Sequence, residues 1–240
     1  MPNLTDPAVI KALLQRHGFS FSRALGQNFI INPAVCPRMA ELGGAAPGVG
    51  VLEIGPGFGV LTAELCRRAE KVVAIELDDR LPPILAETLA EFQNFTLISG
   101  DAMTLDLPAL LEEHFAGMPV VVCANLPYYI TSPIIMRLLE EPLPIRSLTV
   151  MVQKEAAERM LSQPGDKNWC ATAATVRYFA EPSMVMEAPA SLFTPPPHVD
   201  SALLRLEMRE TRAVPAEREE AFLNLIQVAF RMRRKTLANN

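Results

Sequence analysis

The chain has 240 residues, of which 50% are hydrophobic and 20% charged, and its formal net charge at pH 7 is −5. This composition is typical of a globular protein and excludes a disordered or fibrous one. The length suffices for one large domain with a buried core, or for one domain with a small addition. No apolar run reaches the roughly 20 residues of a membrane helix, and the N-terminus lacks the layout of a signal peptide. We therefore expect no membrane partner.

The four cysteines are far apart in the sequence and form no Cys-x-x-Cys pair (Cys36, Cys66, Cys123 and Cys170). This spacing argues against a zinc site and against a disulfide framework, so we expect no metal. Unpaired cysteines fit a reducing compartment, which favours a cytoplasmic location.

The charge is unevenly distributed along the chain. Residues 1–200 carry 14 basic and 22 acidic side chains, whereas residues 201–240 carry 8 basic and 5 acidic ones. The last ten residues contain Arg231, Arg233, Arg234 and Lys235 and no acid. Such a basic end is either a solvated helix end or a patch that binds phosphate groups, and the tail alone does not decide between them.

Short apolar runs alternate with segments that have apolar residues at helical spacing, such as 61–68 and 81–92. The runs lie at 51–54, 72–75, 95–98, 120–123, 148–152, 184–186 and 202–206. Alternation of unbroken apolar strands with helices predicts a parallel sheet covered by helices on both faces. Because the late strands have shorter connections, we expect an antiparallel strand near the end. The fold class is therefore α/β, with a seven-stranded, mostly parallel, Rossmann-like sheet.

Two further segments follow in the C-terminal part. Residues 194–197 include three successive prolines, which predicts a rigid loop because proline fits neither a helix interior nor a central strand. Residues 216–231 have helical spacing after Pro215 and predict a helix.

The most informative segment joins the first strand to the first helix, where glycines stand at 55, 57 and 59. Glycines at this point allow a tight turn and the close approach of a ligand to the N-terminus of a helix. The NAD fingerprint needs a small residue at position 60, where this chain has Val60. Glu53, just before the turn, is an acid that can meet a cationic amino group through water. A mere turn is the alternative for such a glycine loop.

The next two strands also end in acids. Glu76 lies 21 residues after Gly55, where an acid would accept both ribose hydroxyls, and Asp101 with Ala102 follows the third strand, where an acid can accept from an adenine amino group. This pattern predicts an adenosine ligand without a pyrophosphate, so S-adenosylmethionine fits better than NAD. The alternative for Glu76 is a solvated acid in an acidic run. No P-loop is present, which makes ATP a poor candidate.

The fourth strand leads into Asn-Leu-Pro-Tyr at 125–128. An aromatic amine is a poor nucleophile because its lone pair is delocalised into the ring. The side-chain oxygen of Asn125 and a backbone carbonyl held rigid by Pro127 can accept both N–H groups of such an amine, and Tyr128 offers a face for the base to stack on. Neither a metal nor a strong general base is needed. The alternative is a helix-opening turn with a packed tyrosine.

These motifs resemble the ribosomal RNA adenine N6-dimethyltransferases. The resemblance rests on Glu-Ile-Gly-Pro-Gly-Phe-Gly-Val-Leu-Thr (53–62), Asn-Leu-Pro-Tyr (125–128), Leu-Gly-Gln-Asn-Phe (25–29), Phe-Thr-Pro-Pro-Pro-His-Val-Asp-Ser-Ala (193–202) and the Arg-Arg-Lys-Thr-Leu segment (233–237). The motifs keep the family's order over nearly the whole chain. The related macrolide-resistance methyltransferases share several of these motifs but usually lack the glycine-loop sequence found here.

The resemblance implies a site for S-adenosylmethionine in a class I methyltransferase fold. Its cofactor-binding residues would be Asn28, Ile30, Glu53, Gly55, Gly57, Glu76, Asp101, Ala102 and Asn125. Its catalytic residues would be Asn125, Leu126, Pro127, Tyr128 and Phe193, with Tyr128 and Phe193 on either side of the flipped target adenine. Residues 1–210 would form the methyltransferase domain with an N-terminal cap segment, and residues 211–240 the start of a truncated helical C-terminal domain.

The resemblance also implies the reaction and the partner. The family transfers two methyl groups to each of two adjacent adenosines in a hairpin loop near the 3′ end of small-subunit rRNA. The implied partner is therefore the immature 30S subunit, and the implied role is in small-subunit maturation. The sequence leaves the oligomeric state open, and a monomer is the default expectation. A loop adenine costs little to extrude from its stack.

The chain departs from the family at His198, where lysine is usual, and in the amino-acid sequence of residues 167–172. It also ends inside the Arg-Arg-Lys-Thr-Leu region, where the family continues. Two other functions stay open at this point. One is a non-catalytic assembly or transcription factor on the same fold. The other is an amino-methyltransferase acting on DNA adenine or on a protein glutamine, although such enzymes usually carry a second proline where this chain has Leu126.

Overall fold

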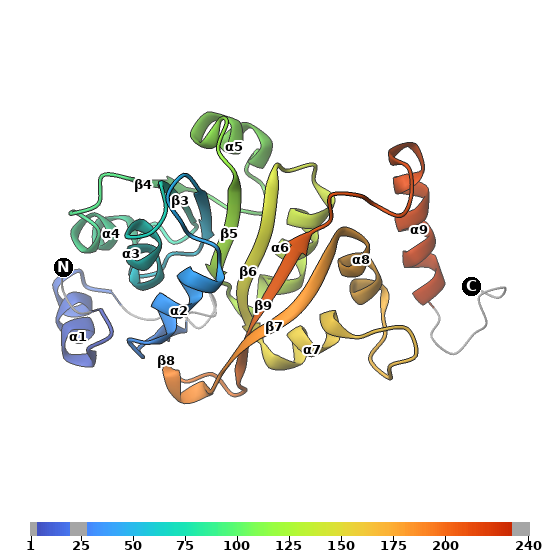
Figure 1. Cartoon of the computed structure of the whole chain (residues 1–240). Coiled ribbons are helices and arrows are strands. Elements are labelled where there is room, and N and C mark those ends of the chain that lie inside the picture. Colours follow the sequence, from blue (N-terminus) through green and yellow to red (C-terminus); the bar gives the residue numbers. More distant parts are fainter. Residues whose placement is uncertain (1–3, 20–27, 232–240) are drawn as a thin grey trace.

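The computed structural model describes residues 4–19 and 28–231, and its centre is a seven-stranded sheet (Figure 1). The strands lie in the order β4-β3-β2-β5-β6-β9-β7. Their bounds are β2 Gly50–Ile54, β3 Lys71–Glu76, β4 Phe95–Ser99, β5 Val120–Asn125, β6 Ile145–Gln153, β7 Ala180–Ala188 and β9 Ser201–Met208. Strands β2 to β6 are parallel, and β9 runs antiparallel to both β6 and β7. The predicted α/β architecture, with one late antiparallel strand, is therefore confirmed.

Helices cover both faces of this sheet. Consecutive residues of a strand point to opposite faces, so Val51 packs in one core cluster with α2 and α3, and Leu52 packs in the other with α5, α6 and α8. The helices are α2 Val35–Leu42, α3 Val60–Cys66, α4 Pro82–Thr88, α5 Leu107–Phe115, α6 Thr131–Glu140, α7 Lys154–Leu161 and α8 Ala171–Phe179. The helices expected at 61–68 and 81–92 are shorter than predicted, because residues 67–70 and 89–91 form turns.

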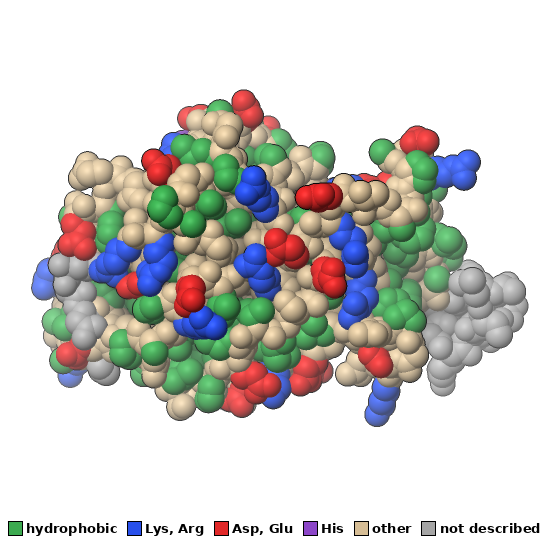
Figure 2. Space-filling model, viewed as in Figure 1, with side chains coloured by type: hydrophobic (Ala, Val, Ile, Leu, Met, Phe, Trp, Pro, Cys, Tyr) green, Lys and Arg blue, Asp and Glu red, His purple; other side chains and the backbone are tan. Residues whose placement is uncertain are grey.

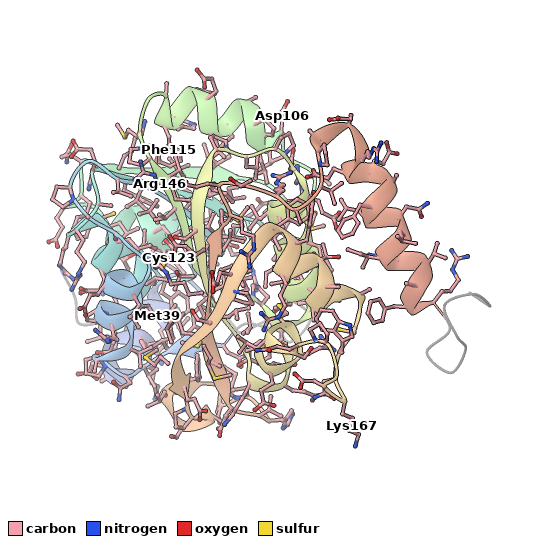
Figure 3. All side chains as sticks on the ribbon, turned by 45° about the vertical axis from the view of Figure 1, so that its right-hand side comes forward. Met39, Asp106, Phe115, Cys123, Arg146 and Lys167 are labelled. Carbon is pink, nitrogen blue, oxygen red and sulfur yellow. The ribbon has the colours of Figure 1, made fainter. Side chains whose placement is uncertain are left out.

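Local contacts set the ends of some elements. Asp106 accepts a hydrogen bond from the amide of Ala109 at 3.0 Å and so caps α5. On the opposite face of the sheet, the Cys123 thiol lies 3.7 Å from the carbonyl oxygen of Met39 in α2 (Figure 3). Cys36, Cys66 and Cys123 pack in one core cluster, and all four cysteines are free thiols.

The N-terminal segment packs beside α4. Helix α1 (Pro7–Arg16) ends near Glu87, which pairs with Arg16 and lies 2.7 Å from Nε2 of His17. Residues 25–27 of the N-terminal motif lie outside the described residues. After them, β1 (Phe29–Ile30) pairs antiparallel with β8 (Phe193–Thr194). We did not predict this small sheet, since two residues are too few to show a periodicity.

The C-terminal segment leaves the sheet at Met208. An exposed connection with a short 3₁₀ turn, η3 (Ala216–Arg218), leads to α9 (Glu219–Phe230), so the helix predicted at 216–231 is confirmed. Helix α9 packs on α8, where the rings of Tyr178 and Phe222 lie 4.9 Å apart and the Tyr178 hydroxyl donates to Glu219 at 2.9 Å. The basic residues at 233–235 lie outside the described part of the chain.

On the face of the molecule that Figure 2 shows, Lys and Arg side chains are interspersed with Asp and Glu rather than gathered in one large basic field. Among the helices within residues 4–19 and 28–231, none combines the length and the apolar character that a membrane crossing requires.

Candidate functional site

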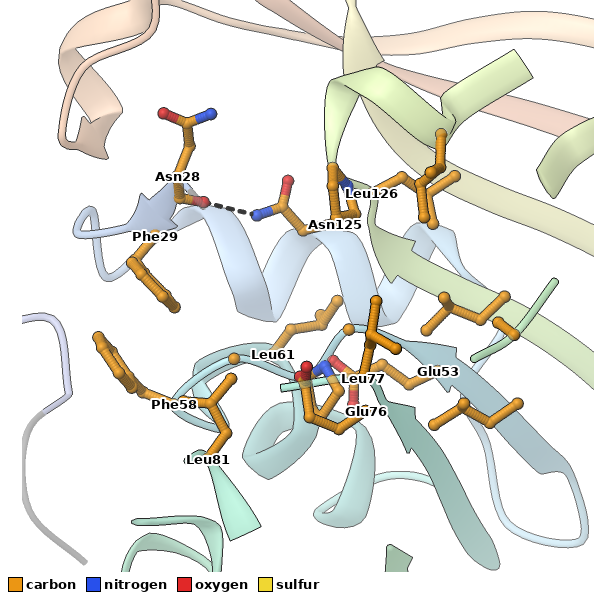
Figure 4. Close-up of a pocket in the computed structure, with 18 of the residues that line it drawn as sticks. Asn28, Phe29, Glu53, Phe58, Leu61, Glu76, Leu77, Leu81, Asn125 and Leu126 are labelled. Atoms are coloured by element: carbon orange, nitrogen blue, oxygen red, sulfur yellow. Dashed lines mark hydrogen bonds between the residues drawn. The ribbon is translucent and has the colours of Figure 1, made fainter. Parts of the chain in front are cut away.

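A pocket of about 230 Å³ lies at the carboxyl ends of β2, β3, β4 and β5 (Figure 4). This is the edge at which open parallel sheets bind nucleotides. Twelve of the thirteen residues predicted for the site line the pocket, from Asn28 and Ile30 at the N-terminal segment to Tyr128 after β5. The parallel topology brings them together, because the carboxyl ends of neighbouring parallel strands meet at one edge.

The glycine loop between β2 and α3 needs its glycines. Gly55, Gly57 and Gly59 all have positive φ angles, of 70°, 59° and 85°. A Cβ atom on Gly57 would lie 2.8 Å from Cε1 of Phe29, which is closer than packed atoms approach. The loop is therefore fitted tightly against the N-terminal segment as well as turned sharply.

Three phenylalanines fasten the N-terminal segment to this loop. The rings of Phe29 and Phe58 stack with their centroids 4.0 Å apart and an interplanar angle of 10°, and Phe19 meets Phe58 edge-on at 5.5 Å. Phe29 and Phe58 also line the pocket (Figure 4). Sequence reasoning missed both residues as pocket residues, because an aromatic side chain in an apolar pattern predicts burial and not which cavity it borders.

Glu76 at the end of β3 is held by backbone amides. Its carboxylate accepts from the amide of Asp78 at 2.8 Å. Burial raises the pKa of Glu76, while the backbone amides of Asp78 and Gly57 act in the opposite direction. Asp101 after β4 is positioned in the same way, since its Oδ1 accepts from the amide of Met103 at 2.8 Å. Both carboxyl groups are thus fixed at the pocket wall.

Glu53 on β2 is more deeply buried than either of these acids. It is 1% exposed, and among the described residues no hydrogen-bond partner reaches its Oε2 atom. Burial raises the pKa of Glu53 to about 8, with the nearby Thr62 hydroxyl acting in the opposite direction. The side chain nevertheless borders the pocket. It is therefore an acid whose charge is unfavourable unless a cation enters beside it.

Asn125 ends β5, and the N-terminal segment fixes the orientation of its amide. Its Nδ2 donates to the carbonyl oxygen of Asn28 at 3.0 Å (Figure 4). Because a carbonyl can only accept, this bond assigns the NH₂ end of the amide to Asn28. The Oδ1 atom is then the end of the Asn125 side chain that is available as an acceptor.

The residues after Asn125 form a rigid turn. The carbonyl of Pro127 accepts from the Ile130 amide and from the Thr131 hydroxyl, both at 3.2 Å, and this closes the turn η1 (Tyr128–Ile130) before α6. Tyr128 is anchored at its tip, because its hydroxyl lies 2.6 Å from Oγ of Ser201 on β9. Its ring lines the pocket.

Phe193 is the exception among the predicted site residues. It is 2% exposed and packs in the core with residues of α2 and β9, and it does not line the pocket. The cause is its backbone pairing with Ile30 in the β1–β8 sheet, which directs the side chain into the core. In this structure the Phe193 ring therefore does not border the pocket, and its role as a second stacking face beside Tyr128 stays a prediction.

Two of the unpredicted hydrophobic side chains at the pocket are exposed. Leu77 is 49% exposed and Tyr129 is 52% exposed, although both line the pocket. Each stands directly after a predicted site residue, Glu76 or Tyr128, which is the only signal the sequence offered. Exposed apolar side chains at a pocket mouth suit a ligand with flat, apolar faces.

Known proteins similar to this chain were found by sequence and by structure. A sequence model described as ribosomal RNA adenine dimethylase matches residues 18–240. The chain is 46% identical over 239 residues to ribosomal RNA small subunit methyltransferase A of Bacillus pumilus, covering 99% of this chain and 82% of that protein. The same enzyme of Alkaliphilus oremlandii is 43% identical over 239 residues, with 100% and 83% covered.

Solved structures agree with these sequence matches. A dimethyladenosine transferase from Plasmodium falciparum is similar with a TM-score of 0.75 and 31% identity, covering 88% of this chain and 74% of that one. The 23S rRNA methyltransferase ErmE is similar with a TM-score of 0.71 and 31% identity, covering 84% and 78%. The methyltransferase fold expected from the sequence is thus confirmed.

Proposed function

Because the chain belongs to the ribosomal RNA adenine dimethylase family, we propose that its pocket binds S-adenosylmethionine and that the protein uses this cofactor to methylate N6 of adenosine in rRNA. It is a methyltransferase acting on rRNA. The observation that carries the assignment is that three acids at strand ends and the oriented amide of Asn125 line the same pocket.

The charges of the pocket fit this cofactor. The described residues that line it include the acids Glu53, Glu76 and Asp101 and no Lys, Arg or His. S-adenosylmethionine is a sulfonium with an ammonium group at one end and an adenosine at the other, so a pocket with acidic walls favours it over a phosphate-bearing nucleotide. We assign the ribose to Glu76, the adenine to Asp101 with Ala102 and Leu77, and the ammonium to Glu53. Asn28, Ile30, Gly55 and Gly57 would line the methionine end.

When bound, the cofactor supplies an electrophilic methyl group. The protein's part is to hold the target amine. The Oδ1 atom of Asn125 and the backbone carbonyl of Leu126 would accept the two N–H groups, with Pro127 keeping that carbonyl rigid. Two acceptors aimed at one nitrogen favour the pyramidal amine that the transition state needs and orient its lone pair. No proton has to leave before attack, because the amine becomes acidic once it is alkylated.

Tyr128 would hold the base itself. Its ring is anchored through the hydroxyl bond to Ser201, so an adenine can stack on the ring without first ordering it. Base–aromatic stacking contributes about 1–3 kcal/mol. The target must leave its own stack to reach the pocket, which favours an adenosine in a loop.

On the substrate, we propose two adjacent adenosines in a hairpin loop near the 3′ end of small-subunit rRNA, each converted to N6,N6-dimethyladenosine. We propose that the protein binds this hairpin in the immature 30S subunit, and that it acts as a monomer in the cytoplasm. We also propose a domain boundary near residue 210, since the exposed connection from Met208 to α9 separates the sheet from the last described helix. Residues 211–240 would then begin a helical C-terminal domain.

The test is methyl transfer to 30S subunits that lack the modification, followed by mass spectrometry of the rRNA fragments. The wild-type chain is expected to dimethylate two adjacent adenosines. Asn125→Ala is expected to lower the transfer rate about 10²–10³-fold, as the loss of one positioned hydrogen-bonding group does in other enzymes. Transfer at an unchanged rate would refute the role given to Asn125.

A matched control is Asn94→Ala. The Asn94 amide donates to the carbonyls of Cys66 and Ala69, away from the pocket, so this variant loses stability but not transfer at temperatures where it stays folded. If the wild type bound 30S subunits without any transfer, and Asn125→Ala supported subunit maturation equally well, the protein would instead be a non-catalytic assembly factor.

A further inference from the structure

The buried carboxyl of Glu53 has a feature that cofactor binding alone does not explain. Its Oε2 atom has no hydrogen-bond partner among residues 4–19 and 28–231, and the side chain is 1% exposed. A carboxylate in such a place would lose the hydration of a full charge without compensation. Glu76 and Asp101 differ from it, because backbone amides donate to both of them.

Within residues 4–19 and 28–231, the titratable groups around Glu53 offer it no positive charge. Its titratable neighbours come from four elements, and they are three thiols and one acid: Cys36 from α2, Cys66 from α3, Glu76 from β3 and Cys123 from β5. Glu64 from α3 acts on Cys36 and is an acid as well. Two guanidinium groups act on the neighbouring thiols, Arg67 on Cys66 and Arg205 on Cys123. Both are paired with other acids, Arg67 with Glu64 and Arg205 with Glu207. Burial and Glu76 both raise the pKa of Glu53.

We propose that Glu53 carries a proton in the cofactor-free protein and releases it when the ammonium group of the cofactor binds, so that cofactor binding expels a proton. In this step the O–H bond of the Glu53 carboxyl breaks, the proton goes to the solvent, and the resulting carboxylate pairs with the ammonium. The methyl group takes no part. The proposal rests on the proposed function only in taking S-adenosylmethionine as the ligand.

Because proton release is coupled to ammonium binding, Glu53 distinguishes ligands that carry the amino-acid end from ligands that lack it. A neutral carboxyl costs little in an apolar wall, whereas a carboxylate beside a cation is stabilised by the low dielectric of the same wall. A ligand that carries an ammonium therefore drives the ionisation, and an adenosine derivative without one does not. This distinguishes Glu53 from Glu76 and Asp101, which meet the adenosine part that both kinds of ligand share.

The test is titration calorimetry at pH 7 in pairs of buffers with different ionisation enthalpies, which counts the protons exchanged on binding. The probes are S-adenosylhomocysteine, which carries the ammonium, and 5′-methylthioadenosine, which lacks the amino-acid end. We expect the first to release about one proton more than the second. The affinity for S-adenosylhomocysteine should rise about tenfold from pH 6 to pH 7, while that for 5′-methylthioadenosine stays constant.

The variant Glu53→Gln keeps the shape of the side chain and cannot ionise. It should bind S-adenosylhomocysteine more weakly, without release of the extra proton and without the rise in affinity between pH 6 and pH 7. If this variant does not fold, the comparison of the two ligands on the wild-type chain decides the question by itself. Binding of S-adenosylhomocysteine with no extra proton would overturn the proposal and leave the function intact. No binding at all would overturn the cofactor assignment with it.

Discussion

The glycine loop offers a sharp test of how the N-terminal segment shapes the pocket, through the variant Gly57→Ala. Gly57 has a φ of 59°, which costs a residue with a Cβ about 1–2 kcal/mol. In addition, the new Cβ would lie 2.8 Å from Cε1 of Phe29, so this ring must move. The ring is 7% exposed and stacks on Phe58, and such a stack contributes about 0.5–1.5 kcal/mol.

The sum is a loss of about 1.5–3.5 kcal/mol in the free energy of unfolding. The displaced ring should also weaken cofactor binding, because Phe29 follows Asn28, whose carbonyl orients the Asn125 amide. If the stacking contribution alone were lost from the bound state, the affinity for S-adenosylhomocysteine would fall about 2- to 10-fold. Urea unfolding and titration calorimetry measure the two quantities on the same protein.

Gly48→Ala is the matched control. Gly48 also has a positive φ, of 77°, but a Cβ there meets nothing within 4 Å, and the residue is exposed at the opposite end of β2. We expect it to lose the backbone contribution of about 1–2 kcal/mol and to bind the ligand as the wild type does. Equal affinities in the two variants would refute the reasoning, because they would mean that the contact of Gly57 with Phe29 does not shape the pocket.

Variants at three further positions test the pocket and the strand that supports it. Tyr128→Ala should raise KM for the RNA about 5- to 150-fold through lost stacking, whereas Tyr128→Phe, which loses only the bond to Ser201, should cost about 1 kcal/mol of stability in urea unfolding. The pKa of Glu53 is about 8 in the folded protein and 4.5 in the unfolded chain, so between these values the folded state binds one proton more. The free energy of unfolding should therefore fall by up to about 1.4 kcal/mol for each unit that the pH rises through this range. Glu53→Gln should flatten this pH dependence in urea unfolding. Gly50→Ala places a Cβ 2.4 Å from Cδ1 of Phe115 and should lower stability by about 1–3 kcal/mol in thermal unfolding, with ligand affinity unchanged.

Each of these expectations has an opposing result. A similar KM for Tyr128→Ala and the wild type would place the base elsewhere in the pocket. A Glu53→Gln protein with the wild-type dependence of stability on pH would show that another group carries the raised pKa. Weaker ligand binding by Gly50→Ala would mean that strain at the far end of β2 is transmitted to the glycine loop.

The strands and the family were predictable from the sequence. A buried parallel strand leaves a short, unbroken apolar run, and the seven runs from 51–54 to 202–206 each lie within a strand. The residues at the ends of those runs are fixed by chemistry, since only glycine tolerates the turn after β2 and only certain groups hold an amine or a ribose. Local order along the chain therefore determined the sheet and the pocket residues at the strand ends, whereas Asn28 and Ile30 were predicted from the family resemblance.

The contacts between distant segments were decided by the tertiary structure alone. Phe193 lies in a motif typical of the family, yet its pairing with Ile30, 163 positions earlier, sends the ring into the core. The bond from Asn125 to the Asn28 carbonyl spans 97 positions and sets which end of the amide faces the substrate. The isolation of the Glu53 carboxyl likewise depends on which side chains of α2, α3 and β5 surround it. A sequence pattern records what each residue is, whereas hydration and partners depend on the packing of segments that are far apart in the chain.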